Sequence, residues 1–224
     1  EAHGVLASSD GVVGTSRRNY PYSSSKAEVH RCHMELPDYD ELAYGDTFDV
    51  SFWFKCYNDS WGGLTYNLLF RSSGWDVSFP QNSTSTLTVR GAANGFSAPM
   101  SPVVNKWAYV TVSFHGTTAD VYTNGVFSAS GKLSKAAAAS GKVIEIGRAP
   151  RYAEGYVDFS CQYDEVRLSG GRATADSVAA DYATMTDASF FTYGAAEDTP
   201  EDPVLTVPAV TWSAAEGFAV DCEL

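Results

Sequence analysis

The sequence predicts an all-β fold, an antiparallel β-sandwich that is closed by one short helix near its C-terminal end. Two observations carry the prediction. Apolar and polar residues alternate along several short segments, and Gly, Ser and Asn separate these segments. A helical apolar period is absent between them, so a βαβ arrangement with a parallel sheet is not indicated.

The clearest strand is FDVSFWFKC, residues 48–56, in which a core face and an outer face alternate. The core face would hold Phe48, Val50, Phe52, Phe54 and Cys56. Residues 106–116, KWAYVTVSFHG, repeat the pattern and predict a second strand with Ala108, Val110, Val112 and Phe114 inward.

A hairpin is predicted at Asn124-Gly125, which lies between two alternating segments. The two central residues of a type I′ turn need positive φ, and Asn-Gly accepts that conformation well. Shorter strands are predicted in NLLFRS, WDVSF, STLTVRG and KVIEIGRA.

The one good helix is predicted in ATADSVAADYATM. Thr174 can cap it, Asp176 stands in the first turn where the helix dipole favours an anion, and Val178 and Tyr182 fall on one face.

Composition limits the classes of function. The formal net charge is -12, and no Lys or Arg cluster interleaves with aromatic residues, so nucleic-acid binding is not supported. No apolar run approaches the roughly 18 residues that a membrane-spanning helix needs. We therefore expect a chain that is not membrane-spanning.

Four cysteines, Cys32, Cys56, Cys161 and Cys222, are widely spaced and form no C-x-x-C motif. Either one disulfide joins two of the first three, or they are small buried thiols, which are equally common in sheet cores.

The amino-acid composition of the chain changes after Tyr193. We expect one domain over residues 1–193, an acidic, Pro-containing linker over 194–203, and the start of a truncated further β domain over 204–224.

Three blocks carry a resemblance to a known family. They are MELPDYDELAYGDTFDVSFWFK (34–55), KWAYVTVSFHGTTADVYTNGVF (106–127) and YDEVRLSGGRATADSVAADY (163–182). In this order they resemble the early strands, the central pair and the closing strand with its helix in concanavalin A-like, laminin-G-type jelly rolls of bacterial surface proteins. The resemblance implies a secreted or cell-surface (extracellular) binding or adhesive domain, with a structural Ca2+ compatible with it.

Glycosidases of this fold carry a repeated-acid strand of the type Glu-x-Asp-x-x-Glu, and nothing here matches that spacing. The adjacent acids Asp164 and Glu165 point to opposite faces of an ideal strand, so they cannot act on one substrate atom. We expect no enzyme activity.

Strand alternation predicts that Glu165 pairs with Arg167 on the outer face, and that Asp164 shares the face of Val166 and Leu168. A carboxylate at that inner rim must be hydrogen-bonded or bound to a cation. Asp164 is therefore either a cap for loop N–H groups or a calcium ligand, and Asp10, in the acidic loop SSDG, is a second candidate for the metal.

Sugar recognition uses aromatic rings that stack on pyranose faces, with polar side chains bonding the hydroxyls. The candidates are aromatic residues in predicted loops and the arginines near them in sequence: Trp61, Trp75, Tyr152, Tyr156, Arg71 and Arg151. Each can also be a rim residue that covers the core.

We expect a non-catalytic carbohydrate-binding module in a larger chain, with a glycan or a cell-surface or matrix molecule as its ligand. The alternative is an adhesive or spacer domain that binds protein or positions neighbouring domains.

Overall fold

The computed structural model describes residues 2–3, 5–8, 10–19, 33–36, 45–57, 66–71, 74–80, 83, 85–91, 94–101, 103–137, 144–147 and 161–191. The chain divides into two compact units, Glu1–Phe190 and Phe191–Leu224. The predicted linker and the predicted further β domain lie outside the described residues, so those boundaries stay predictions.

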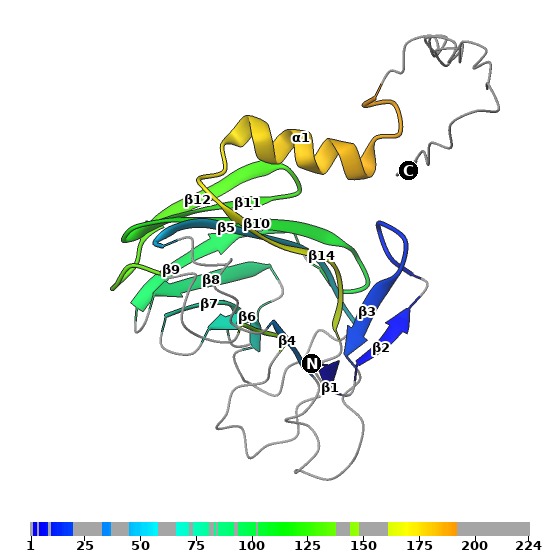
Figure 1. The fold of residues 1–224 in the computed structure, drawn as a ribbon, viewed down its shortest axis with the longest axis horizontal. Coiled ribbons are helices and arrows are strands. Elements are labelled where there is room, and N and C mark those ends of the chain that lie inside the picture. Colours follow the sequence, from blue (N-terminus) through cyan, green and yellow to red (C-terminus); the bar gives the residue numbers. More distant parts are fainter. Residues whose placement is uncertain are drawn as a thin grey trace, which may run out of the picture. The chain divides into compact units, whose positions relative to one another are not determined.

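Two antiparallel sheets form the first unit and lie face to face (Figure 1). In spatial order, sheet A contains β1 (Ala2–His3), β4 (His33–Leu36), β13 (Ile144–Ile146), β6 (Tyr66–Arg71), β7 (Trp75–Phe79), β8 (Thr86–Gly91) and β9 (Asn94–Pro99). Sheet B contains β12 (Val126–Lys132), β11 (Thr118–Thr123), β10 (Ala108–His115), β5 (Thr47–Cys56), β14 (Cys161–Gly170), β3 (Ser16–Asn19) and β2 (Val5–Ser8). The predicted all-β sandwich is confirmed.

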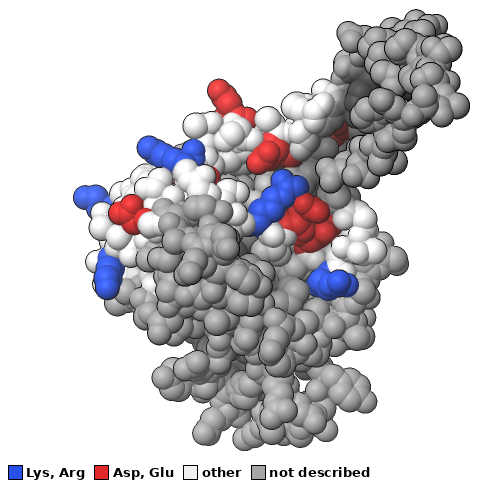
Figure 2. Space-filling view, viewed as in Figure 1, with Lys and Arg blue, Asp and Glu red and all other residues white. Residues whose placement is uncertain are grey.

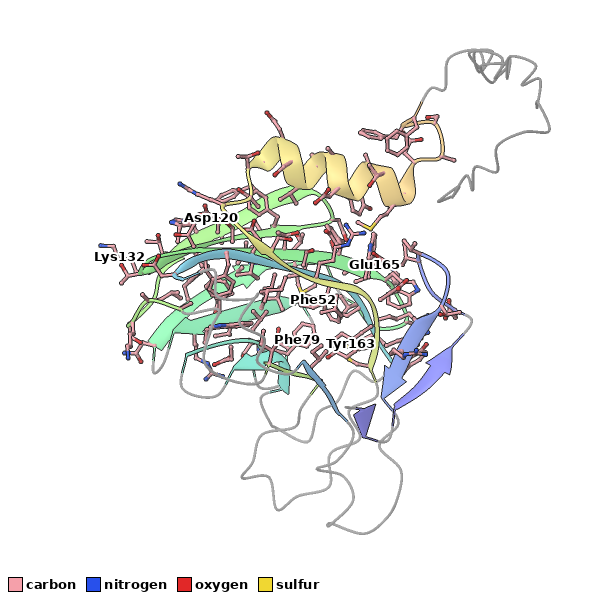
Figure 3. The ribbon with its side chains drawn as sticks, in the orientation of Figure 1. Phe52, Phe79, Asp120, Lys132, Tyr163 and Glu165 are labelled. Carbon is pink, nitrogen blue, oxygen red and sulfur yellow. The ribbon has the colours of Figure 1, made fainter. Side chains whose placement is uncertain are left out.

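The core lies between the two sheets, and the predicted inward faces of β5 and β10 are confirmed. All the residues named for those faces are buried. Rings from both sheets meet there: between ring centroids, Phe54 of β5 lies 5.4 Å from Phe79 of β7, and Phe48 of β5 lies 5.7 Å from Trp75 of β7. Figure 3 shows Phe52, Phe79 and Tyr163 in this interior.

The Asn124-Gly125 turn joins β11 to β12, as predicted. Thr123 pairs with Val126, and the central residues have φ values of +51° and +79°. Both values fall in the left-handed region that a type I′ turn requires.

Helix α1 (Ala175–Thr186) begins where the sequence predicts. The Thr174 hydroxyl accepts from the Ser177 N–H at 3.2 Å, and the Ser177 hydroxyl accepts from the Thr174 N–H at 2.9 Å. These reciprocal bonds satisfy two amides that the helix itself leaves without partners.

The helix lies over the outer face of sheet B (Figure 1). Tyr182 stacks on Trp53 of β5 with 5.6 Å between ring centroids, and the Trp53 indole N–H donates to the Met185 sulfur at 3.2 Å. The outward tryptophan of β5 is therefore buried under α1.

Strand β14 contains a β-bulge that the alternation pattern did not reveal. Asp164 pairs with Trp53, but Arg167 pairs with Ser51, so β14 has one extra residue relative to β5. Glu165 takes a φ of +48° there. The bulge reverses the alternation of side chains between Asp164 and Arg167.

Candidate functional site

An aromatic and polar cluster occupies the outer face of sheet B where β5 ends and β14 begins. We call it the Lys55 cluster, and it consists of Asp10, Lys55, Tyr57, Trp107 and Gln162. Outward residues alternate along β5, so Lys55 and Tyr57 share a face. Gln162 of β14 is the register partner of Lys55 in β5. Trp107 directly precedes β10, whose Ala108 pairs with Phe54, so the indole is brought beside Lys55.

Lys55 is the centre of the cluster. Its ammonium lies 4.9 Å from the Trp107 ring centroid and 5.2 Å from that of Tyr57, and it forms an ion pair with Asp10. Only 9% of the Lys55 side chain is exposed. A cation against two ring faces is stabilised by their quadrupoles, so both rings gain a fixed position.

Gln162 connects the cluster to the first loop of the chain. Its fully buried amide accepts from the Tyr57 hydroxyl and donates to the Asp10 carbonyl and to the Ser16 hydroxyl. The Ser16 hydroxyl also donates to the Asp10 carbonyl at 2.8 Å. Tyr57 and Trp107, both half-buried, are thus held on a prearranged polar network while part of each side chain remains exposed.

Asp164 is a loop anchor, which was one of the two predicted alternatives. One carboxylate oxygen accepts from the Val12 N–H at 2.7 Å and the Val13 N–H at 2.8 Å, and the other accepts from the Glu165 N–H at 2.9 Å. Asp164 therefore ties residues 12 and 13, which lie between β2 and β3, to β14.

The predicted face of Asp164 is wrong. Asp164 stands opposite Trp53 on the outer face, whereas Val166 and Leu168 pack against the core. The cause is the bulge, because its extra residue shifts the inward positions by one. The predicted ion pair is confirmed: the Arg167 guanidinium lies 2.6 Å from the Glu165 carboxylate.

Trp75 is not a loop residue, and that prediction is wrong. It opens β7 and is 2% exposed, with its ring 5.1 Å from Phe114 and 5.7 Å from Phe48 between centroids. A ring enclosed in the core has no free face for a sugar.

The other predicted ligand-binding residues are only partly covered by the structure. Arg71 ends β6 and pairs with Trp75 and Ile144, and its side chain lies outside the described residues. Trp61, Arg151, Tyr152 and Tyr156 also lie outside them. In the sequence, residues 58–65 follow Tyr57 and residues 148–160 precede Cys161.

Calcium stays a prediction. Among the residues that the structure describes, no group of three or more His, Cys, Asp or Glu side chains is arranged to hold a metal ion. The oxygens of Asp164 accept three backbone N–H groups, and Asp10 pairs with Lys55. Calorimetry on chelator-treated protein tests for a site, since calcium binding would release or absorb heat.

A second polar cluster surrounds Asp120 of β11 (Figure 3). One Asp120 oxygen lies 3.0 Å from His115 Nε2 and 2.9 Å from the Arg172 guanidinium, and the Thr118 hydroxyl lies 2.6 Å from His115 Nδ1. Burial acts to raise the pKa of Asp120, but hydrogen bonds from Ser130, Arg172 and His115 outweigh it and lower the pKa below 3.8. The contacts tie the segment before α1 to the β10–β11 hairpin.

Charge does not gather into a patch of one sign on the face shown in Figure 2. There the described basic and acidic side chains lie interspersed. The described helix α1 is not long and apolar enough to cross a membrane.

The described sheets, with their closing helix, define an all-β sandwich of the jelly-roll class. Residues 31–179 match the laminin G-type model described as the concanavalin A-like lectin/glucanases superfamily, and the chain belongs to this family. No curated protein matches the sequence.

Solved structures with a similar fold include receptor-binding domains of toxins. The binding domain of Paraclostridial Mosquitocidal Protein 1 aligns with a TM-score of 0.63 at 14% identity, over 82% of this chain and 47% of that one. The binding domain of botulinum neurotoxin serotype G gives 0.63 at 16%, over 84% and 46%. A botulinum neurotoxin DC binding domain in complex with rat synaptotagmin II gives 0.62 at 11%, over 83% and 46%. The chain spans about half the length of these structures, and the likeness concerns the fold.

Proposed function

We propose that the chain is a non-catalytic carbohydrate-binding module of a secreted or cell-surface bacterial protein. The observation that carries the proposal is the Lys55 cluster, in which two half-buried aromatic side chains stand beside a carboxylate, an ammonium and an amide. A sugar offers both an apolar pyranose face for a ring and hydroxyls for polar groups. Tyr57 and Trp107 supply the first kind of partner, and the Asp10 carboxylate, whose side chain is 58% exposed, supplies the second. The buried Lys55 and Gln162 hold these groups in place.

Preorganisation supports the same conclusion. Lys55 is fixed by two rings and Asp10, and Gln162 is fixed by Tyr57 and Ser16. Side chains that are already ordered lose little conformational entropy when a ligand binds. Trp61, Tyr152 and Tyr156 remain proposed contributors, because in the sequence Trp61 closely follows Tyr57, and Tyr152 and Tyr156 closely precede Gln162.

The absence of catalysis is also part of the proposal. Of the two adjacent acids of β14, Asp164 accepts backbone N–H groups and Glu165 pairs with Arg167. A glycosidase needs two carboxyl groups that converge on one bond at about 5 to 10 Å. Because both acids are held by these other contacts, the arrangement supports a binding function over a catalytic one.

A glycan array with the full chain tests the proposal. We expect binding to a defined glycan class, and roughly fivefold weaker binding after Trp107→Ala, because stacking contributes about 1 kcal/mol. Phe127→Ala is the matched control, since Phe127 is an aromatic residue of β12 that is 51% exposed. Equal binding by the wild type and Trp107→Ala would show that the ligand contacts another surface.

The second candidate is an adhesive or spacer domain without glycan binding. It is favoured by one similar structure, which is a binding domain in complex with a protein, rat synaptotagmin II. A wild-type chain that binds no glycan on the array but is retained by cell-surface proteins would support this candidate over the first.

A further inference from the structure

Cys56 and Cys161 face each other across the central strand pair of sheet B. The two residues are register partners in the antiparallel β5–β14 pair. The Cys56 N–H donates to the Val103 carbonyl at 3.2 Å, and the Cys56 carbonyl accepts from the Asn105 N–H at 2.7 Å. Both backbone groups of Cys56 therefore point away from β14, so the cysteines form a non-hydrogen-bonded pair.

This backbone position suits a disulfide bond. Residues of a non-hydrogen-bonded antiparallel pair have Cα atoms about 4.5 Å apart, and disulfides bridge Cα atoms about 4.4 to 6.8 Å apart. The two Sγ atoms lie 2.9 Å apart, and a disulfide bond is about 2.0 Å long. Less than about 1 Å of approach separates the two arrangements, so β5 and β14 need not move apart or shift register.

The surroundings favour a bond between the two sulfurs over a metal. Both side chains have no exposed surface and lie in the core. Among the residues that the structure describes, no third ligating side chain joins them. A tetrahedral zinc site takes four ligands, so two thiols alone do not form one.

We infer that Cys56 and Cys161 form an interstrand disulfide that joins β5 to β14 when the chain folds in the presence of a low-molecular-weight disulfide. One cysteine thiolate attacks the disulfide and releases the first small thiolate, which leaves a mixed disulfide on the protein. The second cysteine thiolate attacks the protein sulfur of that mixed disulfide and releases the second small thiolate. The two cysteines are oxidised, the small disulfide is reduced to two thiols, and these take up the two cysteine protons.

The bond forms during folding and not afterwards. Burial raises the pKa of the Cys161 thiol well above its ordinary value, and the adjacent Cys56 thiol raises it further. The thiolate is the attacking species, so a fully buried thiol whose pKa is raised reacts slowly. Oxidation accordingly takes place before β14 has closed against β5.

The test is to unfold and reduce the full chain, refold it with oxidised and reduced glutathione, and then block remaining thiols with an alkylating agent under denaturing conditions. Proteolysis and mass spectrometry should give one cross-linked peptide pair that contains Cys56 and Cys161. We also expect reduction to lower the urea midpoint by about 1–2 M, because the bond closes a loop of about 100 residues in the unfolded chain.

Matched variants test whether the stabilisation against urea comes from the disulfide between Cys56 and Cys161. The double variant Cys56→Ala/Cys161→Ala should lose the sensitivity of its midpoint to reductant, and Cys32→Ala/Cys222→Ala should retain it. Alkylation of both Cys56 and Cys161 after oxidative refolding, or their linkage to other cysteines, would overturn the inference. The peptide map uses the wild-type chain, so it decides the question even if a variant does not fold.

Discussion

Replacement of Asp164 by alanine should destabilise the domain through loss of the loop anchor. The substitution removes the acceptor for the Val12 and Val13 N–H groups at 2.7 and 2.8 Å. Hydrogen bonds to a charged group contribute about 1.5–3 kcal/mol each, and the freed amides regain part of this from water. We expect the free energy of unfolding to fall by about 3 kcal/mol, which lowers the melting temperature by about 6–12 °C for a domain of this size.

Urea titration followed by tryptophan fluorescence measures this loss, and thermal scans measure the shift in melting temperature. Glu165→Ala is the matched control, because it removes a neighbouring carboxylate whose partner Arg167 has a side chain that is 44% exposed. That ion pair should contribute less than about 1 kcal/mol. Equal losses for the two variants would refute the role of Asp164 as an anchor.

Three further predictions concern the packing of Trp75, the cluster around Asp120 and the hairpin at Gly125. Trp75→Ala should lower the free energy of unfolding by about 3–5 kcal/mol without changing glycan affinity in the folded fraction, and weaker glycan binding at unchanged stability would contradict its place in the core. The pKa of Asp120 is lower in the folded protein than the ordinary value of 3.8, so the charged carboxylate stabilises the fold above about pH 3.8. This stabilisation is lost as the pH falls through the pKa of the folded state. The urea midpoint should therefore differ less between about pH 6 and about pH 3 in Asp120→Asn than in the wild type. An equal difference in the two proteins would contradict the stabilising role of the Asp120 carboxylate. Gly125→Ala and Gly14→Ala both place alanine at a positive φ, at a cost of about 1 kcal/mol, but only the former puts a Cβ 3.0 Å from the Tyr182 side chain. Urea titration should show the larger loss for Gly125→Ala, and equal losses would argue against contact between the hairpin and α1.

Much of the fold follows from patterns that are local in the sequence. The alternation in residues 48–56 predicts which side chains of β5 enter the core, and Asn124-Gly125 predicts its hairpin, because a two-residue period and a positive-φ requirement are properties of short segments. The Thr174 cap is equally local. Such features do not depend on what a distant strand does.

The bulge in β14 could not be predicted from alternation. Residues 161–170 keep a strand-like pattern on either side of Glu165, and only the pairing with β5 reveals the extra residue. The predicted face of Asp164 failed for this reason. The placement of Trp75 in a loop failed for a related reason, because only the pairing of β7 with β6 and β8 shows that the ring at the start of β7 is buried.

The Lys55 cluster depends on tertiary structure in the same way. Lys55 and Trp107 each appear in sequence as an outward residue near the end of a strand, and nothing local shows that their strands are neighbours. Gln162 gives no sequence signal at all, because a buried amide is recognised only from the groups that bond it. If the pairing of the two strands were known, a basic outward residue at the end of one strand, opposite a tryptophan at the start of the other, would indicate the cluster.

The position of β14 in sheet B also constrains how the domain folds while the chain is being synthesised. β14 pairs with β5 on one side and β3 on the other, although more than 100 residues separate it from β5 in the chain. While the ribosome makes those residues, β5 has no β14 to pair with, and the two-stranded β2–β3 ribbon has no sheet to join. A nascent chain that stops before residue 161 would present unpaired strand edges, which are prone to aggregate. The sandwich can therefore close only after residues 161–170 have been made, when β14 enters between β5 and β3.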